Sequence, residues 1–434
     1  MQQPRRRVAI TGIGLVTPIG NDVRATWASL DAVRNGAAPI TLFDASGFST
    51  RIAAEVKQFD DEAITAPRRL LKFANRSHRF ALAAAEEAIR DAGIAPTDDD
   101  AQRWGCAVGT GMMGVAYSDL SEVQRHSAPD GTIDCRKLLT DPSAADPLAF
   151  CRSQSTAGVA LLTRRFGISG HATSVHTACA SGGQAIGTAL KLIRRGAVDR
   201  ALAGGFDSMI SPVGLAGFCL LSAVSTDNDT PQRASRPFDA TRNGFVLGEG
   251  AGFLVLEEWE AAKRRGARIY AELAGDGNSL SSYRITDSPP NGDGPIQSMR
   301  AALADARATP ADVDYINAHG TSTGMNDRSE TAAIHAVFGD DAKRVFVSST
   351  KSVMGHLIAA AGAVEVAICA LAIDRGEMPV NANYRESDPD CDLNLVLERP
   401  RRQKVRMTLS NSFGFGGSNS CVALRSPELA GDAP

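Results

Sequence analysis

Short apolar segments alternate with helical segments along nearly the whole chain, and this alternation limits the fold more than any other feature. Residues 7–13, 105–109 and 201–206 are apolar runs with the length of single buried strands. The first run is followed by glycines, which we expect to form a turn. A helical segment at 70–92 ends at a glycine. Strands that alternate with helices in this way form largely parallel sheets covered by helices, so the sequence predicts a layered α/β protein.

The pattern starts again near residue 266, and the second half resembles the first. Segment 174–183 (SVHTACASGG) and segment 348–356 (SSTKSVMGH) each combine a strand end, a short turn and a helix start crowded with small residues. Two such halves would bring two helix N-termini to one shared site. We therefore expect an N-terminal half at 1–265 and a C-terminal half at 266–434.

Composition excludes several broad classes of protein. Hydrophobic residues make up 43% of the 434 residues and charged residues 22%, which is typical of a folded globular chain. The formal net charge of −3 gives no reason to expect nucleic acid or an anionic membrane as a partner. The 8 cysteines form no CxxC pair and no zinc spacing, so we expect no metal site and a reducing, cytoplasmic location. The most apolar long segment, 357–373, carries Glu365 and is too short to span a bilayer, which indicates a buried helix.

Cys179 is the first candidate for chemistry. Small residues surround it, and it stands where a strand passes into a helix. The N-terminus of a helix carries partial positive charge and free N–H groups, which lower the pKa of a thiol and favour the nucleophilic thiolate. The alternative, a buried structural cysteine, suits Cys106, Cys219 and Cys369 better, because they lie inside apolar runs.

Two histidines follow strand ends in the second half. His319 precedes a Gly-Thr-Ser-Thr run, and His356 closes the segment that contains Lys351. Neutral imidazoles at such positions can donate hydrogen bonds to a developing enolate or oxyanion, or take up a proton. A structural role is the better interpretation of the remaining histidines, which are His78, His126, His171, His176 and His335.

A glycine-rich loop near the C-terminus is the third candidate. Residues 411–419 have the sequence NSFGFGGSN, so their backbone can approach a substrate closely while two phenylalanines flank it. A free N–H of such a loop could complete an oxyanion hole. The loop lacks the GK[ST] ending of a phosphate-binding loop, and by itself it would be interpreted as a plain turn.

Together these elements resemble the β-ketoacyl-acyl-carrier-protein synthases of type I/II, which are members of the thiolase superfamily. The resemblance covers nearly the whole chain, and the motifs follow the order of the family. The matching segments are VAITGIGLVTPIG at 8–20, TACASG at 177–182, SRPFD at 235–239, GFVLGEGAG at 244–252, NAHGTST at 317–323, STKSVMGH at 349–356 and the 411–419 loop.

The resemblance implies a duplicated, thiolase-like, five-layered α/β/α/β/α fold, and decarboxylative Claisen condensation in fatty-acid or specialised polyketide or polyene synthesis. Cys179 would accept an acyl group from acyl carrier protein as a thioester. His319 and His356 would bind malonyl-carrier protein, promote loss of CO₂ and stabilise the enolate. Lys351 and Glu330 would form an ion pair that orders the two histidines.

The resemblance also assigns residues that bind the substrate. The backbone N–H of Phe415 would complete the oxyanion hole together with that of the nucleophilic cysteine, and the Phe415 ring would act as a gate. Thr321 and Thr323 would hydrogen-bond the phosphopantetheine arm, which arrives on the carrier protein, so no soluble cofactor is implied. Met112 and Phe413 would line the acyl pocket.

A basic stretch offers a landing surface for an acidic carrier protein. Arg68, Lys72, Arg76 and Arg79 have the spacing of one helix face, with Arg69 beside them. Such charges would steer the partner and accelerate encounter. A solvated helix face without a partner is the alternative interpretation.

The chain departs from the family pattern around the expected pantetheine entrance and dimer contact. Asp227 replaces a basic residue, Arg284 replaces a histidine, Asp287 is added, and Gly324 stands where proline is usual. The segment 151–156 also lacks the usual proline. We infer intact chemistry with an altered carrier, acyl chain or partner subunit, and we hypothesise a specialised pathway instead of bulk fatty-acid synthesis.

Other functions stay open as alternatives. A CoA-dependent thiolase would need a second catalytic cysteine in the C-terminal glycine loop, whereas Cys421 lies beyond that loop. A type III starter synthase would carry asparagine in place of His356. A non-catalytic, pocket-shaping subunit would lack Cys179. We expect a homodimer, with the catalytic subunit of a ketosynthase/chain-length-factor heterodimer as the alternative.

Overall fold

A large mixed sheet forms the centre of the computed structural model, which describes residues 5–111, 115–127, 132, 136, 140, 141 and 146–429. Among these residues, ten strands join in the order β10-β9-β13-β14-β8-β1-β7-β6-β4-β5. They are β1 (Val8–Val16), β4 (Trp104–Thr110), β5 (Ala172–Val175), β6 (Arg200–Ser208), β7 (Glu249–Glu258), β8 (Ala271–Leu280), β9 (Tyr315–Asn317), β10 (Phe346–Ser348), β13 (Met407–Phe413) and β14 (Ser418–Arg425). Two short pairs lie outside this sheet, β2 (Ala38–Pro39) with β3 (Ile52–Ala53), and β11 (Glu377–Met378) with β12 (Arg401–Arg402).

The strand order shows the duplication that the internal repeat predicts. Counted outward from the centre, β1-β7-β6-β4-β5 of the first half has the same connectivity as β8-β14-β13-β9-β10 of the second. The halves meet where β1 pairs antiparallel with β8, through Ala9 opposite Glu272 and Ile10 opposite Ala271. The boundary that we placed at 265/266 lies just before β8 and stays a prediction.

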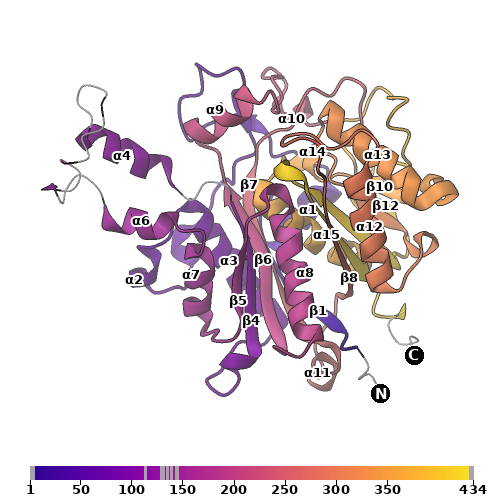
Figure 1. Ribbon diagram of the computed structural model, residues 1–434, viewed down its shortest axis with the longest axis horizontal. Helices are drawn as coiled ribbons and strands as arrows, with labels where there is room; N and C mark the ends of the chain where they lie inside the picture. The colour runs from indigo at the N-terminus through magenta and orange to yellow at the C-terminus, as the bar shows by residue number, and fades with distance from the viewer. Residues whose placement is uncertain are drawn as a thin grey trace.

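Helices form three layers around and between the two half-sheets (Figure 1). In the middle layer, α8 packs on β4 and β6, and α15 packs on β7 and β13. On the outside, α3 and α7 cover the first half-sheet, and α12 covers the second with α13 beside it. Together with the two half-sheets, these layers give the predicted α/β/α/β/α arrangement. The helices of the described part of the chain are α1 (Val23–Asp31), α2 (Arg68–Leu71), α3 (Arg76–Ala92), α4 (Tyr117–Ser127), α6 (Pro147–Ser153), α7 (Ala157–Phe166), α8 (Ser181–Arg194), α9 (Pro212–Leu220), α10 (Pro231–Ala234), α11 (Trp259–Arg264), α12 (Asp293–Ala306), α13 (Gly324–Phe338), α14 (Lys351–Met354) and α15 (Ala361–Arg375).

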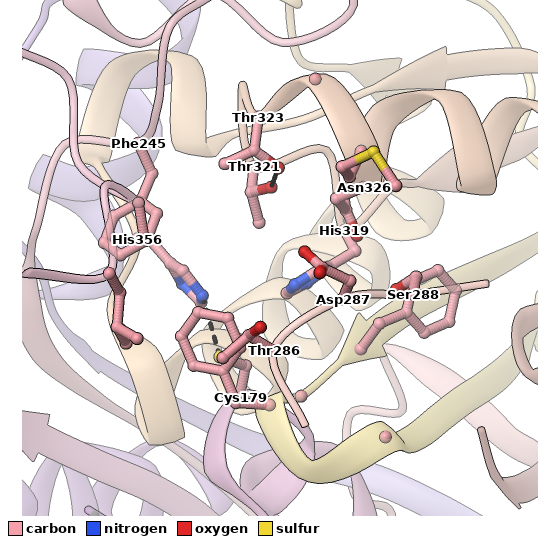
Figure 2. Close-up of a pocket in the computed structure, with 18 of the residues that line it drawn as sticks. Cys179, Phe245, Thr286, Asp287, Ser288, His319, Thr321, Thr323, Asn326 and His356 are labelled. Carbon is pink, nitrogen blue, oxygen red and sulfur yellow. Dashed lines mark hydrogen bonds between the residues drawn. The ribbon is translucent and has the colours of Figure 1, made fainter. Parts of the chain in front are cut away.

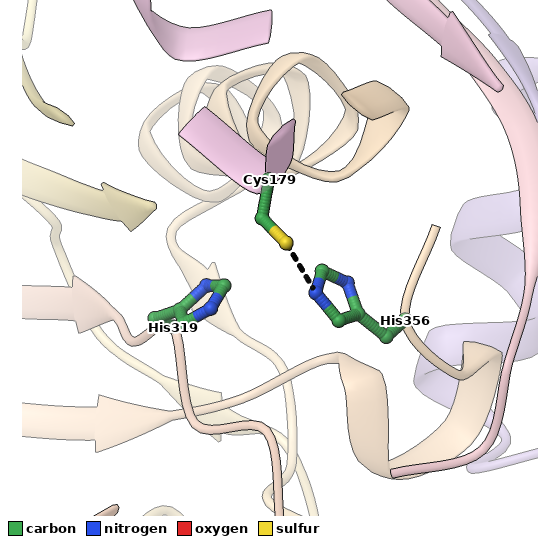
Figure 3. A group of neighbouring side chains, drawn as sticks. All are labelled: Cys179, His319 and His356. Carbon is green, nitrogen blue, oxygen red and sulfur yellow. Dashed lines mark hydrogen bonds between the residues drawn. The ribbon is translucent and has the colours of Figure 1, made fainter. Parts of the chain in front are cut away.

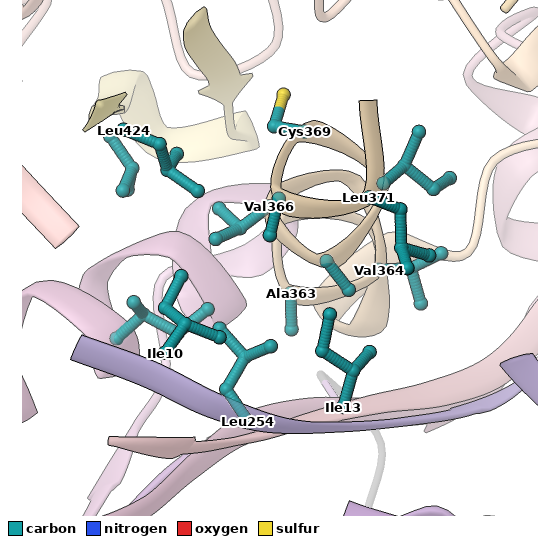
Figure 4. Close-up of a cluster of buried hydrophobic side chains, with 14 of the residues drawn as sticks. Ile10, Ile13, Leu254, Ala363, Val364, Val366, Cys369, Leu371 and Leu424 are labelled. Atoms are coloured by element: carbon teal, nitrogen blue, oxygen red, sulfur yellow. The ribbon is translucent and has the colours of Figure 1, made fainter. Parts of the chain in front are cut away.

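The largest buried cluster surrounds α15. Figure 4 shows Val364 and other apolar side chains of this helix against Ile13 of β1 and Leu254 of β7. Every residue of α15 from 361 to 373 is buried, which confirms the predicted buried helix, and a 3-10 turn at Ile358–Ala360 precedes it. No helix among the described residues is both long and apolar enough to cross a membrane.

The glycines that we expected to form a turn after the first strand lie inside that strand instead. A Cβ at Gly12 would lie 2.2 Å from the carbonyl oxygen of Ala88, and a Cβ at Gly14 would lie 1.8 Å from that of Ala84. Because neither glycine has a side chain, α3 packs directly on the backbone of β1. The first strand therefore continues to Val16.

The basic stretch at 68–79 forms two helices, so the prediction of a single helix face is wrong. The first ends at Leu71, and the second begins at Arg76. Between them, the Asn75 side chain accepts the N–H of His78, and the His78 ring accepts the N–H of Asn75. This reciprocal cap starts a new helix, and the residue spacing is therefore not continuous across it.

Candidate active site

Cys179, His319 and His356 meet in the interior, where the two halves of the chain face each other (Figure 3). The Sγ atom of Cys179 lies 3.0 Å from Nε2 of His356. The two imidazole rings are nearly perpendicular, with centroids 5.3 Å apart. All three side chains are buried, and the cysteine comes from the first half while both histidines come from the second.

Cys179 stands on a strained turn between β5 and α8. Cys179 lies in a 3-10 turn, Ala178–Ala180, directly before the helix. Ala178 has φ +49°, which is uncommon for a residue with a side chain and costs backbone energy. The Ser181 hydroxyl stabilises the turn, because it accepts the N–H of Thr177 and donates to the carbonyl of Ala178.

Glycines hold this turn against the second half of the chain. A Cβ at Gly182 would lie 2.7 Å from the backbone N of Ala363 in α15. A Cβ at Gly414, in the glycine-rich loop, would lie 2.6 Å from the carbonyl oxygen of Thr177. The small residues around the cysteine therefore serve backbone contacts between helices and loops.

Burial dominates the acid–base behaviour of the thiol. It raises the pKa of the Cys179 thiol to about 12, whereas the charge of Lys351 and the backbone N–H groups of Phe415 and Cys179 lower that pKa. The low thiol pKa that we expected from the helix N-terminus is therefore not found. The two N–H groups that lower the thiol pKa are those that the resemblance places in an oxyanion hole.

The hydrogen bonds of His356 fix its neutral tautomer. Its Nδ1 accepts the N–H of Ile358 at 3.3 Å, so the ring proton resides on Nε2, which faces the sulfur. Burial and the Lys351 charge hold the pKa of both His319 and His356 well below the usual range. Both rings are therefore neutral, and His356 is placed as a hydrogen-bond donor instead of a base for the thiol.

The prediction of a Lys351–Glu330 ion pair is wrong, because each of the two side chains has a different partner. Lys351 Nζ forms a buried ion pair with Glu365 of α15. Glu330 of α13 accepts the N–H of His319 at 2.9 Å, the N–H of Gly320 at 2.7 Å and Nδ2 of an asparagine on β13 at 3.0 Å. Its carboxyl group therefore holds the backbone of the His319 turn directly.

A cavity of about 330 Å³ leads from these three side chains to solvent (Figure 2). Thr321 and Thr323 line it, and their hydroxyl oxygens lie 2.9 Å apart. Phe413 contacts the His319 ring at 5.6 Å between centroids, and Phe415 also lines the cavity. The cavity thus brings together residues that lie far apart in the sequence.

Some predicted residues lie elsewhere. Met112 is outside the described residues. Arg76 forms an ion pair with Glu249, which is fully buried, so the half-buried Arg76 guanidinium is already held by a partner within the protein. The remaining predicted docking residues, Arg68, Arg69 and Lys72, are exposed.

Sequence reasoning missed several residues of the site. Phe245 packs edge-on against His356 with centroids 5.2 Å apart, and its position inside a glycine-rich motif was the available signal. The sequence shows Glu365 as a charge inside an apolar run, but we predicted no partner for it. A charge in such a run is a signal for a buried ionic partner. Leu221 and Ile285 at the cavity mouth are 51% and 81% exposed, and single exposed apolar residues cannot be recognised in a sequence.

Comparisons with known proteins agree with this geometry. The family model described as beta-ketoacyl synthase, N-terminal domain, matches residues 5–262, and its C-terminal counterpart matches residues 270–385. A 3-oxoacyl-[acyl-carrier-protein] synthase 2 of Coxiella burnetii is 40% identical over 97% of this chain and 98% of its own length. The ishigamide ketosynthase/chain length factor structure matches with TM-score 0.86 and 37% identity, over 98% of this chain and 100% of that chain. A type II PKS acyl-carrier protein in complex with its ketosynthase bound to the hexaketide matches with TM-score 0.86 and 32% identity, over 98% and 100% of the two chains.

Proposed function

The chain belongs to the beta-ketoacyl synthase family, and from this we propose how its Cys–His–His group performs the condensation. The enzyme is an acyltransferase that joins an acyl thioester to malonyl-acyl-carrier-protein, with loss of CO₂, and forms 3-oxoacyl-acyl-carrier-protein. The observation that carries the proposal is the contact of Cys179 with a neutral His356 beside a neutral His319, at the end of a cavity open to solvent.

In the first half-reaction, we assign Cys179 as the nucleophile. Its sulfur attacks the carbonyl carbon of the incoming acyl thioester, and the negative charge on oxygen is held by the backbone N–H groups of Cys179 and Phe415. The C–S bond to the carrier breaks, and the carrier thiol leaves with the proton that the cysteine loses. The lowering of the thiol pKa by these two N–H groups supports their placement in the oxyanion hole.

In the second half-reaction, we assign His319 and His356 as hydrogen-bond donors to the malonyl thioester oxygen. Loss of CO₂ leaves an electron pair on the α-carbon, and donation from neutral imidazole stabilises the resulting enolate. That carbon attacks the acyl thioester, a C–C bond forms as the C–S bond to Cys179 breaks, and the Cys179 thiolate takes up a proton from solvent. Lys351 and Glu330 are positioning residues, through the pair with Glu365 and through the turn at His319.

The cavity gives a route for the phosphopantetheine arm, which arrives attached to acyl carrier protein. We assign Thr321 and Thr323 as hydrogen-bonding partners of the arm and Phe413 as part of the substrate-facing wall. Phe415 stands at the glycine-rich loop, where movement of its ring would open or close the acyl site. Arg68, Arg69 and Lys72 keep the role of steering the acidic carrier.

A second subunit would cover the exposed end of the sheet. β5 is the terminal strand of the sheet in the described chain, and its residues are partly exposed. A homodimer or a heterodimer with a chain-length-factor-like subunit would protect this edge, because an unpaired strand edge invites association. Among the described residues, 7 cysteines are free thiols, which supports a reducing, cytoplasmic location.

Intact-protein mass spectrometry tests the proposed function. Wild-type enzyme should gain the mass of the acyl group from an acyl-carrier protein, and Cys179→Ala should gain none. Addition of malonyl-carrier protein should then yield a carrier whose 3-oxoacyl chain is extended by one malonyl-derived unit. Acylation of the Cys179→Ala variant would refute the assignment. Failure of every carrier thioester and every CoA ester to acylate the wild-type enzyme would refute it as well.

A further inference from the structure

A strained turn follows His356 in the chain. Ile358 begins the 3-10 turn Ile358–Ala360 and has φ +50°. A positive φ is an outlier for a β-branched residue, and such strain persists only where the surrounding structure holds it. The strained residue has a direct use, because its N–H is the donor that occupies Nδ1 of His356 at 3.3 Å and leaves the ring proton on Nε2.

Asp207 of β6 holds this turn from the first half of the chain. One carboxylate oxygen accepts the N–H of Ala359 at 3.1 Å, and the other accepts the N–H of Ser208 at 2.8 Å. The carboxyl group lies against backbone, since a Cβ at Gly111 would lie 2.2 Å from its Oδ1. A Cβ at Gly205 would lie 2.7 Å from the carbonyl oxygen of Ala359, so the turn itself packs on the backbone of β6.

The hydrogen bond to Ala359 fixes the backbone of Ile358. The N–H of Ala359 belongs to the peptide group that follows Ile358, and the N–H that reaches His356 belongs to the peptide group before it. Only the φ and ψ angles of Ile358 separate these two planar groups. A restraint on one group of a strained turn therefore also restrains the other, and with it the tautomer and position of the His356 ring.

The charge of Asp207 also acts on the Cys179 thiol. Burial raises the pKa of Asp207 to about 7, and the negative charge of Glu249 on β7 adds to this rise. The carboxyl group is therefore mainly ionised at pH 8, where its charge raises the pKa of the thiol. A second cavity, of about 190 Å³, is lined by Asp207 together with other titratable or charged groups, which are His78 of α3, Arg152 of α6 and His176 just after β5.

We propose that Asp207 is a positioning residue for His356, which it holds through the backbone N–H of Ala359. The inference rests on the proposed function, because it concerns the hydrogen bond that His356 donates to the malonyl thioester oxygen in the second half-reaction. A carboxylate on the sheet of the first half thus fixes a reacting group of the second half.

Two substitutions test this role. Asp207→Asn keeps the shape, but its single amide oxygen can replace only one of the two acceptors, and Asp207→Ala removes both. The acyl-enzyme is prepared first, and its single turnover with malonyl-carrier protein is followed by intact-protein mass. We expect the second half-reaction to slow about tenfold in Asp207→Asn, the effect of one weakened hydrogen bond to the reacting oxygen, and further in Asp207→Ala.

The rate of the first half-reaction distinguishes positioning from a general loss of structure. Both variants lack a negative charge near Cys179, so the pKa of the thiol should fall. The thiolate becomes more abundant but less nucleophilic, so acylation by acyl-carrier protein at pH 8 should become about threefold faster, with a pH profile shifted to lower pH. Damage to the fold would instead slow both half-reactions.

Asp276→Asn is the matched control. Asp276 is also buried, lies on β8 in an ion pair with Lys191, and has its Oδ1 2.1 Å from the position of a Cβ at Gly187. This variant should keep both rates near wild type. An unchanged second half-reaction in both Asp207 variants, an equal loss of both half-reactions, or the same selective loss in Asp276→Asn would overturn the proposal. Failure of the wild-type acyl-enzyme to extend its chain with malonyl-carrier protein would instead refute the proposed function.

Discussion

Glu330→Gln separates the two half-reactions of this enzyme. Both carboxylate oxygens of Glu330 accept backbone N–H groups of the turn that carries His319, at 2.9 and 2.7 Å. Glutamine keeps the shape but replaces one acceptor with an NH₂ group, which faces an N–H donor. The His319 turn should therefore shift, while Cys179 and the oxyanion hole that we propose beside it keep their geometry. We expect acylation to continue and malonyl decarboxylation to fall by about 10²-fold, the typical cost of a small misplacement of a catalytic group.

The same substitution should change stability little, because two contributions oppose each other. Burial raises the pKa of Glu330 from 4.5 to about 7, and a rise of that size means that the charged form costs about 3 kcal/mol in the folded state. Glutamine removes this cost. The N–H that loses its acceptor costs about 1–3 kcal/mol. Urea denaturation at pH 8 should thus place the variant within about 2 kcal/mol of wild type.

Glu87→Gln is the matched control for this experiment. Glu87 accepts the backbone N–H groups of Leu15 and Val23, both at 2.9 Å, and burial likewise raises its pKa to about 7. It lies on α3, away from the Cys–His–His group. The control should show a similar small change in stability and no loss of decarboxylation. A wild-type decarboxylation rate in Glu330→Gln, or an equal loss in both variants, would refute the reasoning.

Three further predictions concern other parts of the molecule. Arg76→Gln leaves the fully buried Glu249 without its ion-pair partner and should cost about 3–5 kcal/mol in urea denaturation, whereas Arg68→Gln should change only the salt dependence of carrier encounter. Burial raises the pKa of Asp207 from 3.8 to about 7, so its contribution to stability is complete below about pH 4 and is lost as the pH rises through 7. Asp207→Asn should therefore reduce the decline in unfolding free energy over this pH range, and an unchanged slope would contradict the argument. Thr323→Val should raise the KM for pantetheine thioesters about tenfold with little change in kcat, and steady-state kinetics with a pantetheine thioester measure both constants.

The sequence predicted the layered duplication and the residues at strand ends, because both follow from local patterns. Alternating strand and helix segments dictate layers, and carboxyl ends of strands gather at one edge, which brought Cys179, His319 and His356 together. The partner of Lys351 could not be predicted in the same way. Glu330 and Glu365 both lie in helices of the second half, and only their packing decides which one receives the ammonium group.

Burial was the other quantity that the sequence did not supply. A cysteine at a helix start suggests a lowered thiol pKa, but the depth of Cys179 reverses that expectation.

The break between α2 and α3 had a visible signal, since Asn75 is a good capping residue. The regular spacing of the arginines suggested one continuous helix. The chain forms two helices instead, because the two hydrogen bonds of the cap start α3 at that point.

The glycine contact between α8 and α15 has a consequence for how proteins of this design diversify. Gly182 and Gly362 bring the two helices together backbone to backbone, so the spacing between α8, which follows Cys179, and α15 does not depend on side-chain size at these two positions. Selection can then exchange residues at the entrance and in the side cavities without disturbing that spacing. Asp287 and Gly324 line the cavity that leads to Cys179, at a distance along the chain from both glycines. Laboratory redesign of substrate range should begin at those outer positions and leave the two glycines untouched.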